Sequence, residues 1–165
     1  MKKIASVLVC LAFLAVASAS DRNDREFNLF EFNRLTPVVA PFTGPTNPIR
    51  NLGGGGLPWK ITSGKAELDS AGKLEVHVTG LVLAGTGVNP VANFAAILSC
   101  QSVDPVTKAA TIVNLVAGIA PATTTGDSEI EGRVTLPSPC IAPIVFVAIP
   151  ATATAPARWL AASGF

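Results

Sequence analysis

From about residue 57 to the end of the chain, apolar and polar residues alternate with a period of two. Successive side chains of a β-strand point to opposite faces of a sheet, so this pattern predicts strands with one buried face. The clearest case is the stretch 65–79, in which two alternating runs flank the turn sequence DSAG at residues 69–72. We expect this stretch to form a β-hairpin.

The chain contains one histidine, His77, in the middle of the second strand of this predicted hairpin. The alternation places His77 beside Glu75 and Thr79 on the polar face of the strand. A Ser-His-Asp triad needs a base on a loop or pocket wall next to a nucleophile, and the sequence contains no G-x-S-x-G elbow. We therefore interpret His77 as a polar surface residue and expect no catalytic residue in this strand.

Similar runs, separated by turn sequences, recur to the end of the chain. They predict an all-β fold without helices: a two-layer antiparallel β-sandwich of the immunoglobulin-like type, with seven or eight strands. Ile141–Ile149 is apolar on both faces, which is typical of a central strand. Gly132 indicates a bulge or a close approach to another backbone. The expected strands are 58–62, 65–68, 73–79, 91–101, 109–118, 128–136, 141–149 and 157–165.

The first nineteen residues follow a different pattern. Two lysines precede an apolar run from Ile4 to Val16, and small residues end it at Ala17-Ser18-Ala19. This order predicts a secretory signal peptide over 1–19, cut after Ala19, with Ala17 as the alternative. No 20-residue apolar segment follows, so we expect no membrane span after cleavage. The mature protein is expected to be secreted or associated with the cell envelope.

The next part of the chain is rich in residues that interrupt regular structure. Residues 37–58 include five prolines and five glycines, which disfavour helices and central strands. We expect a flexible lead-in over 20–56 and one domain over 57–165. For residues 21–36, a short helix, a short strand and docking onto a partner remain open. Gly53–Gly56 is not followed by Lys-Ser/Thr, so it is read as a hinge and not as a phosphate loop.

Cleavage of the signal peptide would remove Cys10 and leave Cys100 and Cys140. In a chain exported to an oxidising compartment, two cysteines predict one disulfide. A metal site or reactive thiols are the alternatives, but two isolated cysteines and a single histidine make poor zinc ligands. We therefore expect an inter-strand disulfide, no metal and no cofactor.

Three runs of the chain carry a resemblance: NPIRNLGGGGLPW (47–59), GKLEVHVTGLVL (72–83) and GDSEIEGRVTLPSPCIAPIVFV (126–147). Together with a tryptophan near the C-terminal end, they resemble a group of small secreted bacterial proteins with no known activity. The resemblance covers about residues 47–165. It implies a bacterial exported protein and supplies no activity and no site residues.

Charge excludes two classes of partner. Without Lys2 and Lys3 the chain has ten basic and eleven acidic side chains. This balance provides no electrostatic attraction for nucleic acid or an anionic membrane. Charged residues are 14% of the chain, against about 25% in an average protein, so the surface is rich in small uncharged residues and favours association.

Two groups of residues are candidates for chemistry. Asp127, Glu129 and Glu131 offer the carboxylates needed for glycoside hydrolysis or calcium binding, but we interpret them as a solvated strand face partnered by Arg133 or Lys65. Trp59 and Trp159 are candidate ligand contacts because an exposed indole stacks on sugar rings. The alternative is that both indoles belong to the core.

These observations predict an exported, non-enzymatic protein that acts by binding or assembly. The binding model uses sheet-face or loop residues against a ligand such as a cell-surface polymer. In the assembly model, the segment EFNLFEFNRL (26–35) adds a strand to the sheet of a neighbouring copy. A carbohydrate-binding module and a small secreted carboxylate-dependent hydrolase are the alternatives.

Overall fold

The computed structural model describes residues 27–163, so the predicted signal peptide and its cleavage site lie outside the described residues. The described chain is all-β, as predicted, and contains no helix. Each of the eight predicted stretches contains a strand, and four further short strands were not predicted. The strands are β1 (Asn28–Phe32), β2 (Leu35–Pro37), β3 (Gly53–Gly54), β4 (Trp59–Lys60), β5 (Ser63–Asp69), β6 (Lys73–Thr79), β7 (Val82–Leu83), β8 (Asn93–Val103), β9 (Ala110–Pro121), β10 (Ser128–Arg133), β11 (Ile141–Ile149) and β12 (Arg158–Ser163).

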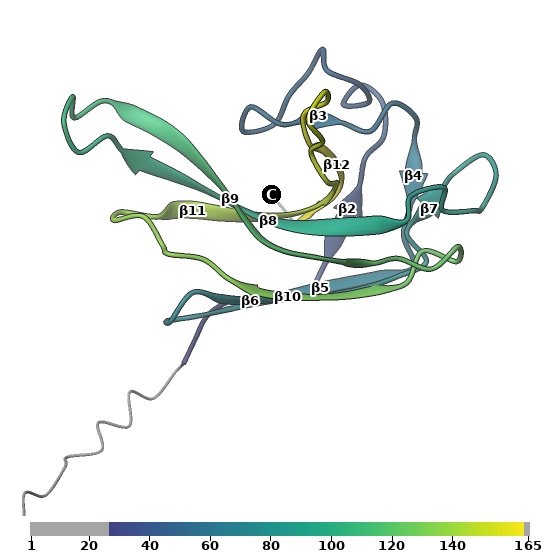
Figure 1. Cartoon of the computed structure of the whole chain (residues 1–165), viewed down its shortest axis with the longest axis horizontal. Coiled ribbons are helices and arrows are strands. Elements are labelled where there is room, and N and C mark those ends of the chain that lie inside the picture. The colour runs from purple at the N-terminus through teal and green to yellow at the C-terminus, as the bar shows by residue number, and fades with distance from the viewer. Residues whose placement is uncertain (1–26, 164–165) are drawn as a thin grey trace, which may run out of the picture.

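The strands form two large sheets and one small one. Sheet A has the order β1-β5-β6-β10, and sheet B has the order β2-β12-β11-β8-β9, with β3 alongside β12. The small sheet joins β4 and β7. All neighbours pair antiparallel except β3 and β12, which are parallel. Sheets A and B lie over one another as two layers (Figure 1).

The hairpin predicted from the alternation is confirmed. β5 and β6 pair antiparallel, and Leu68 lies opposite Leu74 at the turn. Along both strands, buried residues alternate with more exposed ones, so the apolar side of the hairpin faces sheet B. The prediction of a central Ile141–Ile149 strand is also confirmed, because β11 lies between β8 and β12.

The two sheets approach each other closely at β9 and β10. A Cβ atom on Gly132 of β10 would overlap the carbonyl oxygen of Ala117 in β9. A Cβ atom on Gly118 of β9 would likewise overlap the carbonyl oxygen of Glu131 in β10. The predicted special role of Gly132 is therefore a close backbone approach. At the other side of the molecule, the chain itself passes from β1 in sheet A to β2 in sheet B.

Residues 20–56 were expected to be a flexible lead-in, and in the described part, 27–56, the structure differs. β1, β2 and β3 belong to the two large sheets, and Leu35 and Val38 are 2% and 0% exposed. β2 and β3 have two or three residues, which is too short for a period of two to be recognised, and in β1 the adjacent apolar residues Leu29 and Phe30 interrupt the alternation. The fold of the described chain therefore begins well before residue 57.

Residues 38–58, which we call the cover, lie over the face of sheet B that points away from sheet A (Figure 1). Its prolines donate no backbone hydrogen bond, but other residues hold it to β12. Val38 N donates to Leu160 O at 2.8 Å, and Gly55 N donates to Trp159 O at 2.8 Å. The cover buries the outer apolar side chains of sheet B.

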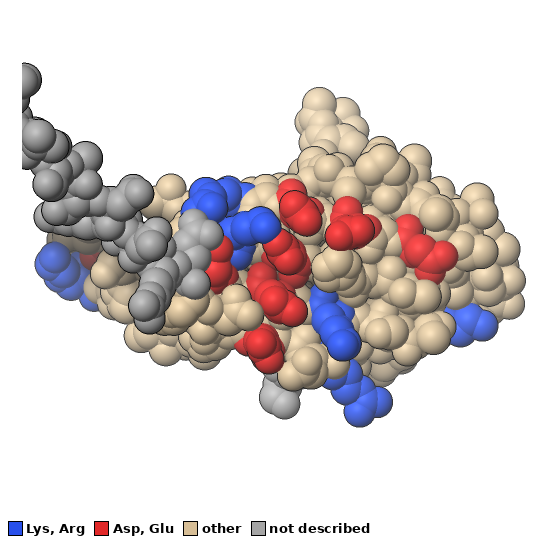
Figure 2. Space-filling view, turned by 90° about the horizontal axis from the view of Figure 1, so that it is seen from below, with Lys and Arg blue, Asp and Glu red and all other residues tan. Residues whose placement is uncertain are grey.

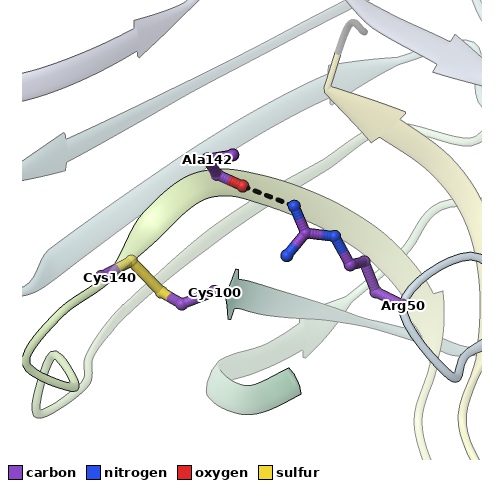
Figure 3. The surroundings of a disulfide bond; sticks show 4 residues. All are labelled: Arg50, Cys100, Cys140 and Ala142. Atoms are coloured by element: carbon purple, nitrogen blue, oxygen red, sulfur yellow. Dashed lines mark hydrogen bonds between the residues drawn. A yellow bond between two sulfur atoms is a disulfide. The ribbon is translucent and has the colours of Figure 1, made fainter. Parts of the chain in front are cut away.

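The predicted disulfide between Cys100 and Cys140 is present, with 5.0 Å between the Cα atoms. Cys100 lies in β8, and Cys140 directly precedes β11. Figure 3 shows that the cover reaches the same region: the guanidinium Nη2 of Arg50 donates to the carbonyl oxygen of Ala142 at 2.9 Å. Ala142 lies at the irregular start of β11 and has a φ of 46°. The start of β11 is thus held by a covalent bond on one side and by the cover on the other.

Candidate functional site

Four glutamates form one row across the outer face of sheet A. Glu31 of β1 lies opposite Glu67 of β5, which lies opposite Glu75 of β6, and Glu75 lies opposite Glu131 of β10. We call these residues the glutamate row. Their neighbours along each strand point inward and are mostly buried. The row therefore places four carboxylates on one exposed surface, in strands from both ends of the sequence.

Further charged side chains lie on either side of the glutamate row. Lys65, His77 and Glu129 form the next row toward one end of the strands. Lys73 lies opposite Arg133 toward the other end. Figure 2 shows this face, with acidic side chains gathered in its middle and basic ones beside them. Of the eight Asp and Glu side chains in residues 27–163, six lie on this face: Glu31, Glu67, Asp69, Glu75, Glu129 and Glu131.

Part of the negative charge of the row is already compensated. Lys73 Nζ forms a hydrogen-bonded ion pair with Glu75 Oε1, and this hydrogen bond and the attraction to Glu75 raise the pKa of Lys73. Asn28 Nδ2 donates to Glu67 Oε2 at 3.3 Å. These residues and Asp69 line a shallow hollow of about 280 Å³.

His77 lies on the polar face of β6, as predicted. Its Nδ1 is 3.7 Å from Glu129 Oε1, and the two side chains are 54% and 65% exposed. Both residues lie on an open strand surface and not on the wall of a cleft. The arrangement supports a polar contact between the two side chains and provides no enclosed position for a nucleophile and substrate.

The structure does not bring the three candidate carboxylates together. Glu129 and Glu131 point outward from β10, whereas Asp127 caps the turn before it. Asp127 Oδ1 accepts from Gly80 N at 2.9 Å, and Oδ2 accepts from Thr125 Oγ1 at 2.7 Å. The Thr125 hydrogen bond, followed by the Gly80 one, lowers the pKa of Asp127. Within residues 27–163, no group of three or more His, Cys, Asp and Glu side chains is arranged to hold a metal ion.

Both tryptophans lie in the core, and each is 3% exposed. The Trp59 ring meets Phe94 edge-on at 6.4 Å between centroids. The Trp159 ring packs against Phe146 at 6.1 Å and against Phe42 of the cover at 6.5 Å. Neither indole presents a ring face to solvent, so neither is placed to stack on a sugar.

Sequence reasoning did not find the glutamate row. The alternation in β5, β6 and β10 does place Glu67, Glu75 and Glu131 on polar strand faces. Whether they lie beside one another depends on the strand order and the register, which alternation within each strand does not contain. Glu31 was missed because its strand was not predicted.

Comparison with models of known protein families, with curated proteins and with solved structures finds no match to this chain. Among the described residues, no helix has the length and apolar character to cross a membrane. The function of the outer face of sheet A therefore has to be argued from its own geometry and charge.

Proposed function

We propose that this chain is an exported, non-enzymatic protein that binds a cationic polymer or peptide through the outer face of sheet A. The observation that carries the proposal is the glutamate row, Glu31-Glu67-Glu75-Glu131. Like charges directly opposite each other destabilise a sheet, by a few tenths to about 1 kcal/mol for each pair. A cationic partner across the row would remove this repulsion, so its binding would stabilise the fold.

The geometry of the row favours an extended partner. Neighbouring strands are about 4.8 Å apart, so four strands spread the carboxylates over about 14 Å. In an extended peptide, side chains on one side repeat every two residues, at about 6.8 Å. Two or three lysines or arginines of such a peptide would therefore span the row. The basic residues beside the row, Lys65 and Arg133 among them, would disfavour a partner that lies along the strands instead.

Three further features belong to the proposal. Export rests on the predicted signal peptide over 1–19, and the disulfide is typical of oxidising compartments. A bacterial source rests on the resemblance described above. An immunoglobulin-like sandwich is the fold class that we propose for the two layers, because a four-stranded sheet and a six-stranded, mostly antiparallel sheet face each other.

The proposal is tested by calorimetric titration of the chain 20–165 with a lysine oligopeptide at low salt. Glu67→Gln and Glu131→Gln should each weaken binding about 3- to 10-fold, and added salt should weaken it further. Asp104→Asn is the matched control, because it removes the same charge from the loop after β8, where Asp104 accepts hydrogen bonds from Val106 and Thr107. Equal losses in all three variants, or no binding at low salt, would reject the face as the binding surface.

Assembly remains a second candidate, because apolar side chains are exposed in and beside β1, an end strand of sheet A. In and beside β1, Phe27, Leu29 and Phe30 are 60%, 38% and 39% exposed. The segment 26–35, expected to add to a neighbour's sheet, instead contributes β1 to the chain's own sheet through β5.

The carbohydrate-binding alternative has less support, because both tryptophans are buried. The hydrolase alternative also has less support, because Glu129 and Glu131 lie on the same strand and do not face each other.

A further inference from the structure

β9 is the last strand of sheet B and its longest, with twelve residues. It pairs with β8 over its whole length, from Asn93↔Pro121 to Val103↔Ala110. Within residues 27–163, one hydrogen bond joins β9 to its other neighbour: Ser128 Oγ donates to Pro121 O at 2.9 Å, at the end of the strand. β10 approaches near Gly118. In the half Ala110–Val116, Asn114 Nδ2 donates to Arg50 O of the cover at 2.8 Å, but the backbone of this half pairs with no described strand other than β8, so it is an open edge.

The open half Ala110–Val116 lacks the features that normally keep strand edges apart, because the register shift of β9 lies just beyond it, at Ala117. Proteins protect edges with charged residues, prolines, bulges or short strands. The sequence of β9, ATIVNLVAGIAP, contains no charged residue and no proline before Pro121. The other end strands are protected: β1 has an irregular register and carries Glu31, β2 has three residues and ends at Pro37, and β10 carries three charges.

The surface next to the open edge is apolar. Val116 and Ile119 of β9 are 57% and 58% exposed. They lie in register with Ile97 and Ala95 of β8, which are 2% and 1% exposed. The outer apolar layer of sheet B is thus buried as far as β8 and becomes exposed at β9. Beyond Gln101 of β8 the hairpin has no partner in β11, and it projects past the two layers (Figure 1).

We propose that two copies of the chain pair antiparallel through Ala110–Val116 of β9, so that sheet B continues from one copy into the other. An antiparallel pair of identical strands has a twofold axis. The backbone N–H and C=O groups on the open edge of each copy would then pair with those of the other copy. The open half spans about 24 Å, and a pair centred on Val113 would use all of it. Because β9 contains no charged residue, no charge repulsion between the two copies of this strand opposes their pairing.

The dimer is closed, because the twofold contact uses the open half of β9 in both copies. It brings the exposed stripes of Val116 and Ile119 from the two copies into one surface on the same side of the continuous sheet. The outer face of sheet A is not used, so each dimer presents two glutamate rows. This inference does not depend on the proposed binding of cations.

The test is light scattering coupled to size exclusion of the chain 20–165 at several concentrations. We expect a concentration-dependent dimer. The single variant Val116→Lys and the double variant Val116→Lys/Ile119→Lys should each raise its dissociation constant at least about 10-fold. Val39→Lys is the matched control, because Val39 is 48% exposed and lies in the cover. Phe30→Lys tests the edge of β1. Neither control should change the dimer, and thermal unfolding verifies that each variant is folded.

Hydrogen exchange provides a second readout that does not need a variant. The outward-facing amides of Ala110–Val116 should exchange more slowly as the concentration rises, while the amides of β1 should not change. A monomer at all concentrations up to about 1 mM would overturn the proposal. A dimer that persists in the double lysine variant, or that disappears in Phe30→Lys, would also overturn it.

Discussion

At the scale of single residues, the contact between β9 and β10 depends on two glycines. Gly118 and Gly132 lie where the two backbones approach each other, and a side chain at either would meet a carbonyl oxygen of the opposite strand. Next to these glycines, Leu115 and Ala117 of β9 pack against the hydrophobic core. Removing this approach would separate the sheets at one border and open the core beside Ile130 to water.

Gly132→Ala should therefore lower the free energy of unfolding by about 1–3 kcal/mol, the usual cost of inserting a group into a packed site. Denaturant titration followed by tryptophan fluorescence measures this change, since both tryptophans are buried. Gly85→Ala is the matched control, because a Cβ atom there meets nothing within 4 Å; its effect should stay within about 0.5 kcal/mol. Equal effects of the two substitutions would contradict the account of a close approach.

At the scale of elements, long and regular strands could be predicted and most short ones could not. β5 and β6 were predicted because they alternate over seven residues each, and β11 because it is apolar on both faces. β2, β3 and β7 have two or three residues, and partners distant in sequence, rather than their own pattern, hold them in place. The disulfide was predictable because only two cysteines remain after the expected cleavage.

The disulfide connects two elements that are already paired, since β8 and β11 are neighbours in sheet B. It closes a loop with a sequence separation of 40, for which the chain-entropy model gives about 4 kcal/mol of stabilisation. Replacing Cys100 and Cys140 together by alanine should lower the free energy of unfolding by about this amount while the strands of sheet B still form. Circular dichroism and denaturant titration measure the two effects.

Reduction of the wild-type chain is the control for this substitution. The reduced protein and the double alanine variant should have similar stabilities, because both lack the covalent closure. A variant as stable as the oxidised protein would contradict the expected contribution of loop closure to stability. Loss of all β-structure at neutral pH and low temperature would instead show that the bond is required for folding.

At the scale of the whole molecule, the two layers present different surfaces. Sheet A exposes its charged face, with the glutamate row. Sheet B carries the cover over β12 (Figure 1) and exposes Val116 and Ile119 of β9. The candidate site could be predicted only in part: alternation placed Glu67, Glu75 and Glu131 on polar faces, but only the strand order brings them into a row. The cover could not be predicted, because its prolines and glycines mark a loop and do not say where the loop packs.

Because residues 27–56 contribute strands and buried side chains to both layers, we expect them to be required for folding. Leu35 and Val38 are 2% and 0% exposed, and burying such side chains contributes about 1.5–3 kcal/mol each. Their loss would remove about 3–6 kcal/mol from a total stability that is about 5–15 kcal/mol in an average domain. A chain shortened to 57–165 would also expose the outer face of sheet B, where Phe42 now lies near Trp159.

We therefore expect the chain 57–165 to lack a cooperative thermal transition or to aggregate, whereas the chain 20–165 unfolds cooperatively. Calorimetry of the two chains at the same concentration measures the difference. Leu35→Ala in the longer chain is the control that keeps the cover in place; it should unfold cooperatively with about 2–5 kcal/mol less stability. A shortened chain with the same transition temperature as the longer one would show that the domain begins at residue 57 and that the cover contributes little to the fold.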